Sequence, residues 1–115
     1  MKVIVAGGRD FFPEFKHSQW LTEQLHELKA THIISGKARG ADSFGEEIGR
    51  LLRLDIIEYP ANWDRYGKKA GPLRNEEMAK VADACILFPG GQGTKNMRDL
   101  AEAYDVPIIE WEDEE

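Results

Sequence analysis

A glycine-rich run from residue 88 to residue 94 is the stretch of this sequence best suited to hold a ligand. It follows the apolar segment 84–88, which predicts a buried strand, and it precedes a helical pattern of apolar residues that extends to Tyr104. Glycine lets a ligand approach the backbone, and a helix start offers free N–H groups and a partial positive charge. The run therefore predicts a phosphate-binding loop, with Gly90, Gly91 and Gly93 beside the ligand.

A second glycine-rich turn begins at Ser35, after another predicted strand. Gly36 and Gly40 permit a tight turn before the next helix, and Arg39 can reach an anion. Asp42 has two interpretations of equal weight: it caps that helix, or it accepts hydrogen bonds from a sugar hydroxyl. Two such loops in one small chain predict a nucleotide-like ligand.

The turn after the first predicted strand carries Arg9. Its residues match neither the glycine pattern of dinucleotide-binding loops nor a Walker loop. The Arg9 guanidinium can form a fork with a phosphate or a carboxylate, and the alternative is a surface salt bridge to Asp10 or another neighbour. We favour the ligand role, because the loop after the first strand faces the ligand crevice in a chain of alternating strands and helices.

Residues 61–75 combine two aromatic side chains, four cations and two glycines. Trp63 or Tyr66 can stack on a nucleotide base, and Arg74 and Asn75 can contact phosphate or base edges. The alternative for Trp63 is that its ring packs this segment onto the domain.

The formal net charge is −6, from 15 basic and 21 acidic residues, and this balance argues against tight nonspecific binding of nucleic acid. Many of the basic residues nevertheless fall in segments predicted to be loops after strands: Arg9, Lys37, Arg39, Arg65, Lys68, Lys69, Arg74 and Lys95. Such loops converge at one edge of a parallel sheet, so we expect a local basic edge there. The alternative is that these cations are merely solvated.

Several classes of protein are not indicated. No apolar run is long enough to span a bilayer, and the apolar part of the N-terminus is too short for a signal peptide. The single cysteine, Cys85, excludes an internal disulfide, fits a reducing cytoplasm and is expected in the core. The three histidines have no metal-ligand spacing, so we predict neither a metal site nor a cofactor. A homodimer stays open, with Trp20 or Trp111 at its interface.

Predicted strands and helices alternate along the chain. The strands are expected at 3–6, 32–35, 55–59, 84–88 and 107–109. The helices are expected to begin near Ser18, Ser43, Gly71 and Thr94, with Glu46 completing a capping box at the second. Residues 61–69 are expected to form a polar connection. This alternation predicts one α/β domain over residues 1–115, with a parallel sheet covered on both faces by helices.

Four segments of the chain, taken together, resemble a known family: GGRDF, SGKARGAD, ANWDRYGKKAGPLRNEEM and FPGGQGT. They are similar to the YspA/cpYpsA-related branch of the SLOG superfamily, which also contains the lonely-guy phosphoribohydrolases and DNA-processing protein A. The resemblance covers nearly the whole chain, and the third segment is its most specific part. Small stand-alone domains of this branch are common in bacteria and their phages.

The resemblance implies a Rossmann-like three-layer α/β/α sandwich with a mainly parallel five-stranded sheet. It also implies a pocket for a nucleotide or nucleotide-derived molecule at the carboxyl edge of that sheet. The residues implied to line the pocket are Gly7, Arg9, Ser35, Gly36, Arg39, Gly40, Asp42, Arg74, Asn75, Gly90, Gly91, Gly93 and Thr94.

One position departs from the hydrolytic members of the superfamily. They carry a glutamate where this chain has Met97, and methionine cannot stabilise the cation-like sugar formed when an N-glycosidic bond breaks. We therefore expect the protein to sense, sequester or process a nucleotide-derived ligand, and no catalytic residue is assigned. The first alternative is nucleotide N-glycosidase activity, with Asp42, Asp99 or Glu102 in place of the glutamate. The second is binding of single-stranded DNA.

Overall fold

The computed structural model describes residues 1–113. Within this range, five parallel strands form one sheet in the order β3-β2-β1-β4-β5. The strands are β1 (Lys2–Ala6), β2 (His32–Ser35), β3 (Asp55–Glu58), β4 (Ala84–Leu87) and β5 (Ile108–Glu110). The predicted Rossmann-like sandwich is confirmed, and the described sheet is parallel throughout.

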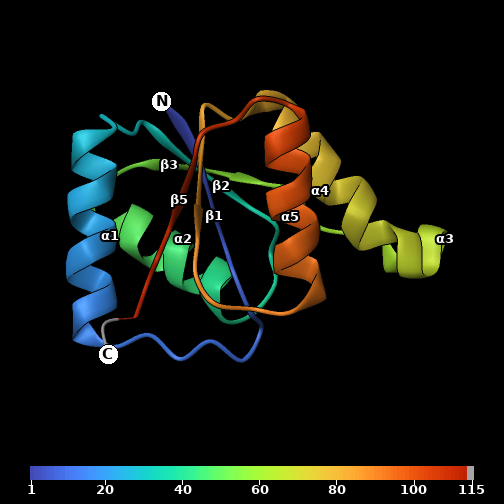
Figure 1. Cartoon of the computed structure of the whole chain (residues 1–115), viewed down its shortest axis with the longest axis horizontal. Coiled ribbons are helices and arrows are strands. Elements are labelled where there is room, and N and C mark those ends of the chain that lie inside the picture. The colour runs from blue at the N-terminus through green and yellow to red at the C-terminus, as the bar shows by residue number, and fades with distance from the viewer. Residues whose placement is uncertain (114–115) are drawn as a thin grey trace.

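Helices cover both faces of the sheet (Figure 1). The helical segments are α1 (Phe15–Glu27), α2 (Ala41–Leu51), α3 (Trp63–Tyr66), the 3-10 turn η1 (Gly67–Lys69), α4 (Ala70–Val81) and α5 (Gln92–Ala103). The first two helices pack on one face, and α4 and α5 pack on the other. No helix within residues 1–113 is long and apolar enough to cross a membrane.

The central strand β1 shows how the sequence builds both cores. Val3 and Val5 belong to the core under α1 and α2, whereas Ile4 and Ala6 belong to the core under α4 and α5. Successive strand residues point to opposite faces, so a strand covered on both sides is a continuous apolar run. Cys85 lies in the second core as expected, and burial raises the pKa of its thiol to about 12.

The first two helices begin earlier than predicted. At the start of α1, the Glu14 side chain accepts from the backbone of His17, and the Glu14 N–H donates to His17 Nδ1 at 2.8 Å. This reciprocal cap moves the helix start ahead of Ser18. At the start of α2, Glu46 completes no capping box with Ser43, because the N-cap is Gly40 and the buried Glu46 carboxylate accepts from Ser35 instead.

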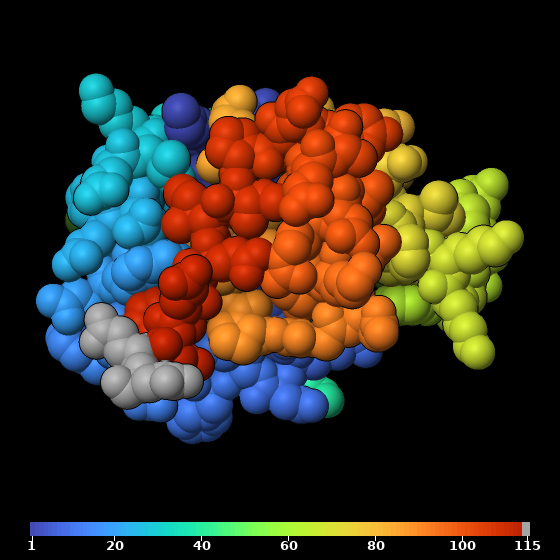
Figure 2. Space-filling view, viewed as in Figure 1, coloured from blue at the N-terminus to red at the C-terminus, as the bar shows by residue number. Residues whose placement is uncertain are grey.

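The prediction of a polar connection at residues 61–69 is wrong, because residues 63–69 form the helical segments α3 and η1. Asn62 caps α3 by accepting a hydrogen bond from the Arg65 N–H at 3.1 Å, and η1 then leads directly into α4. Figures 1 and 2 show α3 standing out from one end of the molecule. The cations of this segment are therefore carried away from the body of the sheet.

The two tryptophans considered for a dimer interface lie together within one chain. The rings of Trp20 and Trp111 are 5.3 Å apart in an edge-to-face arrangement, and both pack against the core beside Phe88. Both side chains remain partly exposed.

Candidate functional site

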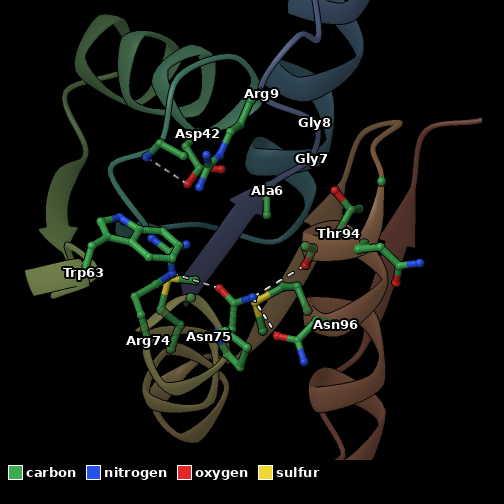
Figure 3. A pocket seen from close by; sticks show the side chains of 18 residues that line it. Ala6, Gly7, Gly8, Arg9, Asp42, Trp63, Arg74, Asn75, Thr94 and Asn96 are labelled. Atoms are coloured by element: carbon green, nitrogen blue, oxygen red, sulfur yellow. Dashed lines mark hydrogen bonds between the residues drawn. The ribbon is translucent and has the colours of Figure 1, made fainter. Parts of the chain in front are cut away.

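The sheet reverses its strand order between β1 and β4, and a pocket of about 610 Å³ opens at the carboxyl ends of these strands (Figure 3). It is lined by the loops after β1, β2 and β4, by Trp63, by α4 and by the start of α5. Pockets for small molecules usually measure roughly 300–1,000 Å³. The pocket therefore has the position and the size expected of a ligand site in this fold.

Backbone contacts tie the loops around the pocket together. The Gly8 N–H donates to the Pro89 carbonyl at 2.8 Å, and the Ala41 N–H donates to the Gly8 carbonyl at 3.2 Å. Gly40 adopts a positive φ of 76°, and a Cβ on it would overlap the Gly8 carbonyl oxygen. Glycine is required at this position by both its backbone angle and the close approach of the first loop.

Asp42 is a buried carboxylate that faces the pocket, with 6% of its surface exposed. The cap of α2 is Gly40, and Asp42 Oδ2 instead accepts a hydrogen bond from the Ala38 N–H at 3.3 Å. The capping interpretation of Asp42 is therefore wrong. Burial raises its pKa to about 6, although the Ala38 N–H and the nearby Arg74 guanidinium favour the charged form.

Arg74 and Asn75 begin a polar chain between the two helices that flank the pocket (Figure 3). Arg74 donates to the Gly36 carbonyl and, through Nε, to Asn75 Oδ1 at 2.9 Å. Asn75 Nδ2 then donates to Asn96 Oδ1 on α5 at 2.9 Å. Burial lowers the pKa of the Arg74 guanidinium, and Asp42 opposes that shift. The chain of hydrogen bonds holds the Arg74 side chain against the loop after β2.

Trp63 and Arg9 form another part of the pocket wall. The Arg9 guanidinium lies 5.5 Å from the centroid of a Trp63 ring, a distance suited to a cation–π contact. The Trp63 ring also lies over Gly71, which partly supports the packing interpretation, but 47% of the residue is exposed. Arg9 does not pair with Asp10, whose carboxylate pairs with Arg39 at 3.0 Å.

The start of α5 forms the opposite wall. Gly91 and Gly93 line the pocket, and a Cβ on either would meet no atom within 4 Å. Thr94 is buried beneath them, and α5 has no acidic residue in its first turn. Met97 also lines the pocket from the next turn while packing in the core.

The structure distributes the predicted ligand residues as follows. The pocket is lined by Gly7, Arg9, Asp42, Trp63, Arg74, Asn75, Gly91, Gly93 and Thr94. Gly36 and Arg39 line a smaller cavity beside it. Neither lining includes Ser35, Gly40 or Gly90. Ser35 is fully buried and donates to Glu46 Oε2 at 2.6 Å, and a Cβ on Gly90 would overlap Thr94 Oγ1.

Some lining residues were not predicted, and some predicted cations lie elsewhere. The unpredicted residues are Ala6, Gly8, Ala38, Gly71, Pro72, Met78, Gln92, Asn96 and Met97. Most are neighbours of the recognised motifs, but the pairing of Asn96 with Asn75 depends on the packing of two helices and has no local signal.

The cations that line neither cavity are Arg65, Lys68, Lys69 and Lys95. Of the eight cations predicted to form a basic edge, Arg9, Lys37, Arg39 and Arg74 line one or both cavities. Tyr66, the other candidate for stacking, also lines neither cavity.

The topology and the pocket define a Rossmann-like α/β domain with a crevice at its switch point. The chain is 31% identical over 121 residues to the Gene 61 protein of Mycobacterium phage D29, and the match covers 97% of each protein. The chain therefore belongs to the family of this phage protein. No protein-family model matches the sequence, and no solved structure matches the chain.

Proposed function

We propose that this protein binds a nucleotide or nucleotide-derived molecule in the pocket between β1 and β4. The observation that carries the proposal is the composition of the two walls. Gly91 and Gly93 leave the backbone at the start of α5 bare on one side, and Asp42, Arg74 and Trp63 face it from the other.

The bare wall suits a phosphate. Glycine in a helix costs about 1 kcal/mol relative to alanine, and no atom within 4 Å of an added Cβ demands glycine at position 93. A phosphate that approaches the first N–H groups of α5 would demand it, because a side chain there would obstruct the approach. Ligand binding therefore explains a glycine at position 93, whereas the packing of the fold does not require one.

The facing wall suits the rest of a nucleotide. The guanidinium groups of Arg9 and Arg74 neutralise negative charge, and the half-exposed Trp63 ring offers a surface on which a base stacks. Asp42 is an acceptor for the hydroxyl groups of a sugar.

Calorimetric titration with nucleoside monophosphates, ADP-ribose and cyclic dinucleotides tests the proposal. Gly93→Ala should weaken binding at least tenfold and leave the free energy of unfolding unchanged or higher. Lys95→Ala is the matched control, because Lys95 lies in the same turn of α5, is exposed and pairs with Asp99 outside the pocket. No binding by any member of the panel would overturn the proposal.

One observation favours a second candidate, cleavage of the bond between base and ribose. Of the carboxylates considered in place of the missing glutamate, Asp42 lines the pocket, whereas Asp99 and Glu102 do not. Its pKa of about 6 suits an acid or base that works near neutral pH. Release of free base from a nucleoside monophosphate, lost in Asp42→Asn, would support this activity. Absence of base release at high protein concentration would exclude it.

A further inference from the structure

A smaller cavity of about 320 Å³ adjoins the pocket on the β2–β3 side of the sheet edge. It lies between the loop after β2 and the segment after β3, which contributes Pro60 and Ala61. The residues that line both cavities are Arg9, Ala38, Trp63 and Arg74. The two cavities therefore adjoin at these four residues.

The smaller cavity is lined by cations. Arg9, Lys37, Arg39 and Arg74 face it, and no carboxylate belongs to its lining within residues 1–113. The partners of Lys37 and Arg39 are Glu46, Glu58 and Asp10, which lie outside that lining. Within the same described range, Arg9 forms no salt bridge. The lining therefore offers the N–H donors of four cationic side chains, of which Lys37 and Arg39 are already paired with carboxylates outside it.

The loop that carries these cations is held in place. Lys37 adopts a positive φ of 62°, which is costly for a residue other than glycine. Its N–H donates to Ser35 Oγ at 3.1 Å, and its Nζ contacts the buried Glu46 at 3.0 Å. Although burial alone would raise the pKa of Glu46, hydrogen bonds from Ser35 and Lys37 hold it below its usual value. The Lys37 ammonium is thus fixed beside the cavity.

We infer that the ligand is a nucleotide extended by a second phosphate-bearing unit, and that this second unit occupies the smaller cavity. The inference rests on the proposed function. A nucleoside monophosphate has one anionic group for the start of α5 and leaves the cationic cavity empty. Both a 5′-phosphorylated dinucleotide joined by a phosphodiester and a dinucleotide joined by a pyrophosphate supply the second anionic group.

The test compares ligands of matched composition by calorimetry. The probes are adenosine 5′-monophosphate, the 5′-phosphorylated dinucleotide of adenosine, diadenosine pyrophosphate, and a single-stranded oligoadenylate. The cavity variant combines Lys37→Gly with Arg39→Ala. Glycine tolerates the positive φ at position 37, so the charge is removed without adding backbone strain. The control is Lys68→Ala, because Lys68 is exposed on η1 and lines neither cavity.

One of the two dinucleotides should bind at least tenfold more tightly than the monophosphate to the unaltered protein, and the better one identifies the linkage. The cavity variant should lose this advantage and keep its affinity for the monophosphate within about twofold, while the control keeps both. Equal affinities for mono- and dinucleotides, or equal weakening of both in the cavity variant, would overturn the inference and leave the proposed function standing. Tighter, strongly salt-dependent binding of the oligoadenylate would overturn it in favour of nucleic-acid binding. Binding of no probe would overturn the inference, and the wider panel of nucleotides described under the proposed function would then decide that function separately.

Discussion

Replacing Asp42 with asparagine should stabilise the fold above neutral pH while it weakens ligand binding. The carboxylate is 6% exposed, and burial raises its pKa from 3.8 to about 6. Ionising this group therefore costs about 3 kcal/mol more in the folded protein than in the unfolded chain. Asparagine keeps the shape without the charge, but Arg74 loses a negative neighbour. We expect the free energy of unfolding to rise by roughly 1–3 kcal/mol at pH 8.

The direction of the shift determines where the effect appears. The folded protein keeps the Asp42 proton up to about pH 6, whereas the unfolded chain releases it near 3.8. The stability that the bound proton of Asp42 contributes is fully present below pH 3.8 and is lost as the pH rises through about 6. The variant lacks this dependence, so its advantage over the unaltered protein should be absent at pH 3.8 and grow to its full size by pH 8.

Urea unfolding followed by tryptophan fluorescence between pH 4 and pH 8 measures the effect directly. Asp99→Asn is the control, because this exposed carboxylate on α5 pairs with Lys95 away from the pocket. It should change the free energy of unfolding by less than about 1 kcal/mol. A variant at Asp42 that is less stable than the unaltered protein at pH 8, or whose advantage does not depend on pH, would refute the reasoning. Lower stability of the variant would mean that the hydrogen bonds of the Asp42 carboxylate contribute more to folding than its loss of hydration costs.

Two further predictions concern the loops and the aromatic core. Gly40→Ala should lower the free energy of unfolding by more than about 2 kcal/mol in urea, since the new Cβ overlaps the Gly8 carbonyl. Gly67→Ala, with a positive φ but open surroundings, should cost only about 1 kcal/mol, and equal losses at both sites would contradict the steric argument. Burial lowers the pKa of His17 from 6.5, so its contribution to stability should fall as the pH drops below that value. In an Asp42→Asn background, the opposite pH dependence that Asp42 contributes is absent. There, His17→Gln should reduce the fall in the free energy of unfolding at low pH. An unchanged fall would mean that another group causes it.

The sequence alone was enough to predict the sheet and the edge at which the pocket lies. Apolar runs such as 84–88 are contiguous, and their alternation with helical patterns leaves few topologies open. The glycine-rich turns mark the ends of these strands, and in a parallel sheet those ends meet at one edge. Both features depend on local residue order, which a single sequence contains in full.

The role of each side chain at that edge was decided only by the tertiary structure. Asp42 had two interpretations in sequence, and the loop after β2 assigns its hydrogen bond to Ala38 instead of to a helix cap. The segment after β3 becomes helical through the Asn62 cap and carries Lys68 away, while Arg74 is drawn to the Gly36 carbonyl. The Arg74 contact joins residues far apart in the chain, whereas the hydrogen bonds of Asp42 and Asn62 are local ones that the residue types alone do not choose. The geometry of such contacts comes from packing, and the spacing of residue types does not contain it.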